Sequence, residues 1–302
     1  MSVYCYRSTD AGSPVLTGEV GSLEALLISC LVTGYNLKTP AGWTNPYFDA
    51  FSNSAFKAGV GGNEFYVRIA DDVDSHANLA YLSGFATMTD IDTGTERTPS
   101  VTQNAYGVSI LKSATQDATG RGWIILASHQ MVYMFINHSS SSDYTEAEGF
   151  CFGEFKSFKD LDTDNFIIAG RDPLDYTTSN TDKFGTFTSV DTAIDYNYLM
   201  KSYTSIGSSV ACGKHADTSK DGLPFPNLVD GNLFLAPVFV HESGNLSVRG
   251  VLPGLWHICH PASYFTTGDT FTGNGALAGK EFLIVKVKGR AFALETSDTW
   301  DI

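Results

Sequence analysis

The strongest indication of the fold is the stretch Trp123-Ile124-Ile125-Leu126-Ala127-Ser128-His129-Gln130-Met131-Val132-Tyr133-Met134-Phe135-Ile136. Two apolar runs, rich in branched and aromatic side chains, flank a short polar segment at residues 128–130. Apolar runs of this length on either side of a polar segment are typical of a β-hairpin. The stretch therefore predicts two paired strands, at residues 123–127 and 131–136.

Further strands are predicted on both sides of this hairpin. Residues 64–69 alternate apolar and polar side chains, and phenylalanines recur at positions 150, 152 and 155. Other strand-like runs lie at 165–169, 232–240, 246–251, 281–288 and 291–295, with a tight turn expected at 288–290. Residues 40–53 are predicted to form a loop, and residues 55–58 a helical turn that ends at glycines.

One convincing helix is predicted at residues 22–32. Apolar residues recur with the helical spacing i, i+3, i+4, i+7 and i+8, at Leu23, Leu26, Leu27, Cys30 and Leu31. Ser22 is expected to cap the amino end, and Gly34 stands where a left-handed residue often ends a helix. The apolar stripe is expected to pack on a sheet.

Strands outnumber helices, which predicts an α+β chain that is predominantly β. We expect antiparallel sheets, one clear N-terminal amphipathic helix and long polar loops. A length of 302 residues suits one large domain or two modest ones. Polar residues dominate 171–227, so we divide the chain into an α+β region at 1–171 and, at 172–302, a polar segment followed by a β-rich region. A single domain is the alternative.

Composition excludes several classes of protein. The content of 20 Phe, 14 Tyr and 4 Trp is too aromatic for intrinsic disorder, and the formal net charge of −14 disfavours nucleic-acid binding. The N-terminus lacks a signal-peptide pattern, and no apolar run is long enough for a membrane span. Five widely spaced cysteines predict reduced thiols in a protein made in the cytoplasm.

Two segments have some of the residues of a metal site. Asp160, Asp162 and Asp164 have calcium-loop spacing, but Asn165 and Arg171 stand where that loop needs Gly and Glu. The cluster His257, Cys259 and His260 is short of the ligand set that zinc needs, unless His215 or Cys212 completes it. We therefore predict no metal, a solvated acidic turn at 160–165 and a hydrogen-bonded turn around the histidines. Other acids, at positions 71, 72 and 74, are expected to be exposed.

No motif indicates catalysis or a cofactor. The glycine-rich segment 273–279 leads into a strand instead of opening a helix, which disfavours phosphate binding and predicts a turn. The chain has no Gly-x-Ser-x-Gly nucleophile elbow. Glycoside hydrolysis needs two carboxylates, but in a chain with 33 acidic residues their presence says nothing about such an activity. Phe150, Phe152, Phe155 and Phe158 are expected to be core or interface, with a sugar-binding platform as the alternative. We predict no catalytic residue, no cofactor and no enzyme activity.

An ordered set of short segments extends along the chain. These segments are Tyr6-Arg7-Ser8-Thr9-Asp10-Ala11-Gly12, Pro14-Val15-Leu16-Thr17-Gly18, Gly21-Ser22-Leu23, Gly34-Tyr35, Lys38-Thr39-Pro40-Ala41-Gly42-Trp43-Thr44, Phe65-Tyr66-Val67-Arg68, Met88-Thr89-Asp90-Ile91-Asp92-Thr93-Gly94, Leu252-Pro253-Gly254-Leu255, Gly268-Asp269-Thr270-Phe271 and Leu294-Glu295-Thr296-Ser297-Asp298-Thr299-Trp300. The set resembles a family of uncharacterised virion structural proteins of tailed bacteriophages. The resemblance covers both ends and much of the middle, outside about 172–228.

The resemblance implies a tail-associated component of the phage particle. We expect a non-enzymatic structural subunit of the tail, baseplate or neck, assembled in the host cytoplasm. Its expected partners are copies of itself and other virion proteins. The alternatives are a capsid decoration protein, a module that binds host-surface glycan, and an enzyme acting on the cell envelope. The expected interface residues are Trp43, Tyr176, Phe184, Asp298 and Trp300, with folding back of Trp300 onto its own subunit as the alternative.

Overall fold

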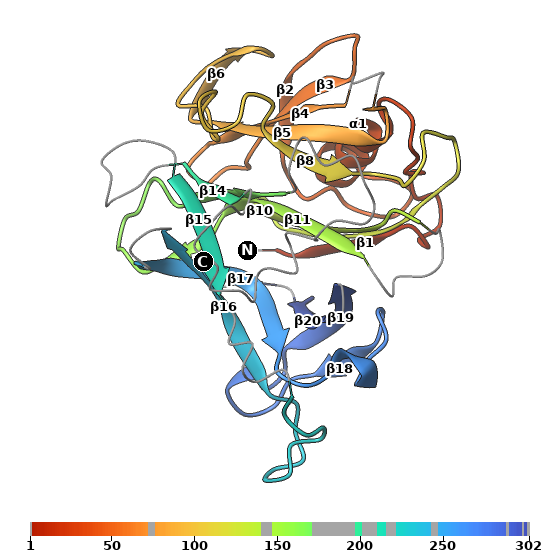
Figure 1. The fold of residues 1–302 in the computed structure, drawn as a ribbon, viewed down its shortest axis with the longest axis vertical. Helices are drawn as coiled ribbons and strands as arrows, with labels where there is room; N and C mark the ends of the chain where they lie inside the picture. The colour runs from red at the N-terminus through yellow and green to blue at the C-terminus, as the bar shows by residue number, and fades with distance from the viewer. Residues whose placement is uncertain are drawn as a thin grey trace.

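The described residues form stacked layers of antiparallel β-sheet with little helix (Figure 1). The computed structural model describes all residues except 1, 72–75, 140–146, 171–196, 201–209, 216–221, 243–246, 288–289, 298 and 301–302, and only the backbone of 197 and 210–215. The expectation of a predominantly β chain with antiparallel sheets is confirmed.

The largest sheet has thirteen strands within the described residues. Its order is β1 (Tyr4–Arg7), β9 (Gly122–Ala127), β10 (Met131–Asn137), β11 (Glu148–Glu154), β13 (Phe166–Ala169), β14 (Asn197–Leu199), β15 (Val210–His215), β16 (Leu235–Glu242), β17 (Val248–Ile258), β20 (Arg290–Glu295), β19 (Glu281–Val287) and β18 (Thr270–Thr272), while β12 (Lys156–Ser157) pairs with β17. The hairpin predicted at residues 123–136 is confirmed, since β9 and β10 pair antiparallel from Val132 opposite Ala127.

A second sheet lies above the first half of the large one (Figure 1). It has the order β2 (Thr44–Phe48), β3 (Asn53–Lys57), β4 (Tyr66–Ala70), β5 (Leu79–Phe85) and β8 (Val108–Leu111). A hairpin of β6 (Thr87–Asp90) and β7 (Thr93–Thr95) packs Met88 onto Phe85 of this sheet.

The strands β9, β10, β11 and β13 form a middle layer that is buried on both faces. Because side chains alternate along a strand, β10 directs Val132 and Met134 into a core shared with the five-stranded sheet. Tyr133 and Phe135 point into a second core, shared with β16, β17, β19 and β20. We call these the N-terminal and C-terminal cores. Burial on both sides explains why the sequence here is continuously apolar.

The predicted helix is α1 (Ser22–Leu27), continued by the π-helical stretch η1 (Ile28–Thr33). The four leucines expected to face the core are fully buried, in the N-terminal core. The expected Ser22 cap is wrong, because the Ser22 hydroxyl donates to the carbonyl of Thr17 instead. Gly34 does have positive φ, at 77°.

Two local expectations are wrong. Residues 55–58 are not a helical turn but belong largely to β3, which pairs with strands on both sides. Residues 44–48, expected in a loop, form β2. In both segments pairing within a sheet outweighs a weak local preference.

The large sheet and the C-terminal core include strands from both sides of residue 171, where we placed the boundary between regions.

Candidate functional site

A groove of about 790 Å³ lies beside β18, at the end of the large sheet. One wall is the loop 222–234, which leads into β16 and protrudes at the lower end of the molecule in Figure 1. The other wall is formed by η5 (Ala262–Tyr264), β18 and η6 (Gly275–Leu277). We call it the C-terminal groove.

His260 fastens the two walls together. Its Nε2 accepts a hydrogen bond from the backbone N–H of Phe234 (2.8 Å), and its Nδ1 donates to the carbonyl of Leu223 (3.0 Å). The ring of Phe225 packs on its edge, with centroids 5.4 Å apart. Both ring nitrogens are occupied by the protein, so His260 is a structural residue of the groove.

The remaining members of the predicted His/Cys cluster do not converge with His260. His257 lies within β17, not in the turn that we expected, and Cys259 Sγ is 3.8 Å from His257 Nδ1. The side chains of His215 and Cys212 lie outside the described residues. Among the side chains that the structure describes, no three His, Cys, Asp or Glu residues are grouped as metal ligands.

The glycine-rich segment 273–279 forms the outer edge of the groove. Gly275 and Gly279 have φ of 57° and 81°, so this segment is a turn that uses the left-handed region, as predicted. Asn274 Nδ2 donates to Asn232 Oδ1 across 2.5 Å, which joins this edge to the opposite wall.

A second candidate lies where the loop 58–64 meets the loop 155–165. Asp162 accepts hydrogen bonds from Arg249 Nη2 (3.1 Å) and the Ser157 hydroxyl (2.6 Å), and Arg249 Nη1 donates to Glu242 (2.8 Å). The Asp162 carboxylate is only 1% exposed. The expectation of a solvated turn is therefore wrong at Asp162, whereas Asp160 is exposed. Arg171 lies outside the described residues.

Exposed apolar side chains lie on the segments that this ion-paired network and its neighbouring hydrogen bonds join. Val60, Phe158, Leu161 and Val248 are 98%, 59%, 96% and 51% exposed. Phe158 is held by its backbone N–H, which donates to the carbonyl of Arg249, and Asn63 Nδ2 donates to the carbonyl of Asp162. We call these four residues the junction surface. Four phenylalanines were expected in the core or at an interface, with a sugar-binding platform as the alternative. Three of them, Phe150, Phe152 and Phe155, are buried in the core.

Glu154 lies beneath the loop 58–64 and is buried at the end of β11. Its Oε1 accepts the backbone N–H of Asn63 (2.6 Å), and its Oε2 accepts Gln130 Nε2 (3.3 Å). Burial raises the pKa of Glu154 to about 7, although the hydrogen bond from Asn63 opposes this shift. A β-carbon at Gly62 would lie 2.4 Å from Glu154 Oε1, so a larger residue there would displace the carboxyl.

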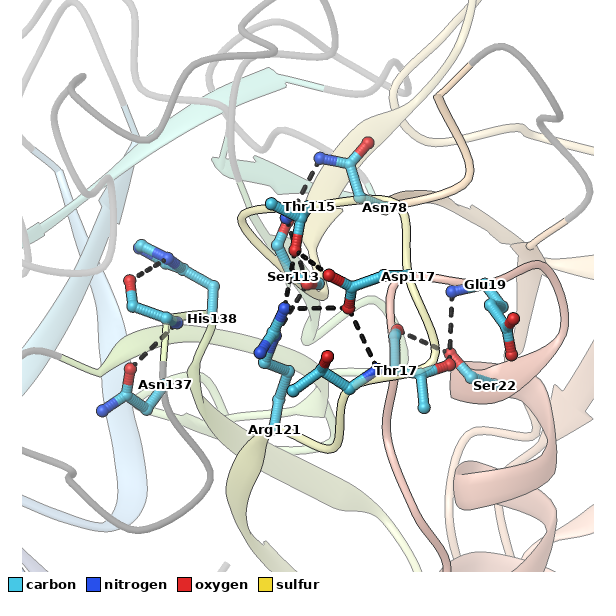
Figure 2. Close-up of polar contacts among 12 residues, drawn as sticks. Thr17, Glu19, Ser22, Asn78, Ser113, Thr115, Asp117, Arg121, Asn137 and His138 are labelled. Carbon is cyan, nitrogen blue, oxygen red and sulfur yellow. Dashed lines mark hydrogen bonds and ion pairs between the residues drawn. The ribbon is translucent and has the colours of Figure 1, made fainter.

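Two further polar clusters are structural. Figure 2 shows Arg121 held by the hydroxyls of Ser113 and Thr115, both at 2.7 Å, and by Asp117 at 3.1 Å. Elsewhere, Asp71 pairs with Lys112, and both side chains are fully buried. Asp71, expected to be exposed, instead accepts the backbone N–H groups of Leu23 and Glu24 and so caps α1. Positions 72 and 74 lie outside the described residues.

The structure places two of the five expected interface residues. Trp43 and Trp300 are both buried within the chain, each 2% exposed. Trp300 Nε1 donates to the carbonyl of Glu295 (2.9 Å), and its ring packs on Tyr133 of the C-terminal core. This is the alternative arrangement, in which the tryptophan folds back onto its own subunit. Tyr176, Phe184 and Asp298 lie outside the described residues.

Comparison of the chain with protein-family models and with curated proteins gave no match. Across the described ranges, no helix has the length and apolar character needed to cross a membrane. Cys5, Cys30, Cys151 and Cys259 are thiols and not disulfides.

Proposed function

We propose that this protein is a non-enzymatic structural subunit of a tailed-phage virion, located in the tail, baseplate or neck. The ordered sequence segments that resemble phage virion proteins support this role. The observation that carries it is the junction surface, where four exposed apolar side chains stand on a buried ion-paired network.

Single exposed apolar residues are ordinary, but several on segments that are bonded to one another can form a contact surface. The loop 158–165 is held at several points, by Arg249, Ser157 and the pairing of β12 with β17. A loop whose backbone is already held in place loses less entropy when a partner binds. The junction surface is therefore suited to packing against a neighbouring subunit of the particle.

The charge of the chain is compatible with this role. A formal net charge of −14 keeps subunits apart in solution and limits binding to packaged DNA. Local apolar contacts can then act only where subunits are brought together in the growing particle. A capsid decoration protein would share these properties, and location in the particle separates the two possibilities.

Incorporation into particles tests the proposal. The double variant Phe158→Asp, Leu161→Asp places two charges on the junction surface, where burial against a partner would leave them unpaired. The matched control is Leu37→Asp, a site 93% exposed elsewhere on the chain. All proteins are first shown to be folded by circular dichroism, and copies per purified particle are then counted by quantitative mass spectrometry.

We expect the double variant to be at least tenfold depleted from particles and the control to be incorporated at the wild-type level. Equal incorporation of the double variant would show that the junction surface is not an assembly contact. Absence of the wild-type protein from purified particles would contradict the structural role itself.

A further inference from the structure

We propose that the C-terminal groove binds a neutral oligosaccharide. This inference goes beyond the proposed structural role and does not depend on it, because the groove is complete in the isolated chain. Its volume of about 790 Å³ falls within the range of about 300–1,000 Å³ that is usual for small-molecule sites.

Aromatic rings line the groove and remain accessible. Phe225, Phe234 and Tyr264 are 37%, 48% and 57% exposed. The Phe225 ring is fixed by contact with Tyr264 and Phe265, at centroid distances of 5.7 and 5.0 Å. The face of an aromatic ring is electron-rich, so it attracts the weakly positive C–H groups on the flat side of a sugar ring. Such rings are platforms on which a saccharide can stack.

Polar groups on the rim match sugar hydroxyls. The bond between Asn274 Nδ2 and Asn232 Oδ1 leaves Asn274 Oδ1 as an acceptor and Asn232 Nδ2 as a donor at the same edge. Asp269 uses Oδ2 to accept the backbone N–H of Thr266 (2.9 Å), which leaves Oδ1 as a second acceptor. A sugar hydroxyl both donates and accepts, so neighbouring hydroxyls can satisfy this mixed set.

The charge of the lining selects a neutral ligand. None of the described residues that line the groove is Lys or Arg, and Asp269 contributes a negative charge. Carboxylated or phosphorylated sugars and nucleic acids would meet repulsion here without a cation to pair with. A purely apolar peptide would also bind poorly, because it would bury the remaining polar atoms, Asn274 Oδ1, Asn232 Nδ2 and Asp269 Oδ1, without offering them a hydrogen bond.

The test uses the purified full-length chain on an array of neutral and acidic bacterial surface oligosaccharides. Saturation-transfer NMR with each free oligosaccharide then measures the affinity of those that bind. The variants Tyr264→Ala and Asn274→Ala remove one stacking ring and one hydrogen-bonding side chain. Tyr106→Ala, a tyrosine 60% exposed outside the groove, is the matched control.

We expect at least one neutral oligosaccharide to bind, with an affinity reduced at least tenfold by Tyr264→Ala and by Asn274→Ala but unchanged by Tyr106→Ala. The inference is overturned if no neutral oligosaccharide binds, if only acidic ones do, or if both groove variants bind as the wild type does. It is also overturned if the groove is filled by a neighbouring subunit in the particle. Because binding is measured on the isolated chain, a negative result leaves the proposed place in the virion intact.

Discussion

Asp71 joins three parts of the chain that lie far apart in sequence. It directly follows β4, caps the first turn of α1 and pairs with Lys112, 41 residues away. The sequence predicted an exposed aspartate because two further acids follow closely. Its buried partner directly follows β8, another strand of the same sheet, and sequence spacing cannot reveal such a pairing. Burial raises the pKa of Asp71 to about 6 even beside Lys112.

Replacing Asp71 with asparagine should leave Lys112 charged and buried without its partner. The free energy of unfolding should fall by about 3–5 kcal/mol, as is usual when one member of a buried ion pair is removed. Urea denaturation measures this change. The double variant Asp71→Asn, Lys112→Met is the control, since it should recover part of the loss by removing the isolated charge. A loss below about 1 kcal/mol for Asp71→Asn would contradict the pairing.

Glu154 should make stability depend on pH. Its pKa rises from 4.5 to about 7 on folding, so the folded protein holds a proton that the unfolded chain releases. The contribution of Glu154 to stability is therefore fully present below about pH 4.5 and is lost as the pH rises through 7. Denaturation of the wild type and of Glu154→Gln should be compared at several pH values. Their stability difference should change by up to about 1.4 kcal/mol per pH unit in this window. A constant difference would mean that Glu154 is not buried.

At the scale of elements, packing of the helical stretch into the N-terminal core should contribute to the stability of the chain. Leu27 is fully buried between α1 and the sheets. Leu27→Ala should reduce the free energy of unfolding by about 2–5 kcal/mol, because it removes apolar contacts and leaves a cavity. Leu37→Ala makes the same chemical change at an exposed site and should cost less than about 0.5 kcal/mol. Similar losses for the two variants would contradict the packing of the helix.

The C-terminal segment contributes to folding through Trp300. The ring packs on Tyr133, and a β-carbon at Gly254 would lie 2.2 Å from Trp300 Nε1, so the contact is close. Trp300→Ala should destabilise the isolated chain by about 3–5 kcal/mol, measured by urea denaturation. From sequence alone we expected Trp300 at an interface, with packing on its own subunit as the alternative. A variant with wild-type stability and impaired incorporation would restore the interface interpretation.

The elements that the sequence predicted best are those with strong, continuous patterns. The β9–β10 hairpin has two long apolar runs around a polar turn, and both strands form as expected. In contrast, β5 (Leu79–Phe85) is buried on both faces, so it lacks the alternation that identifies a strand. β3 was mistaken for a helical turn because Ala55 favours a helix, whereas pairing with β2 and β4 holds the segment in a strand.

At the scale of the whole molecule, the strands from both halves of the chain share one large sheet and one C-terminal core. The candidate surfaces lie mostly on loops and strand ends, where periodicity is weak. The glycine-rich edge at 273–279 was visible in the sequence, but its partner Asn232 lies about 40 residues away. The junction surface likewise depends on contacts between distant loops. Neither site could therefore be assembled from spacing alone.

The central claim is that this chain is a structural subunit of a tailed-phage particle. An electron cryomicroscopy reconstruction of the intact particle tests it most directly, because location, copy number and neighbours are seen together. We predict density in the tail, baseplate or neck that fits the layered sheets, with the junction surface covered by a neighbouring subunit and the C-terminal groove open to solvent. A complete particle map in which every density is assigned to other proteins would contradict the claim.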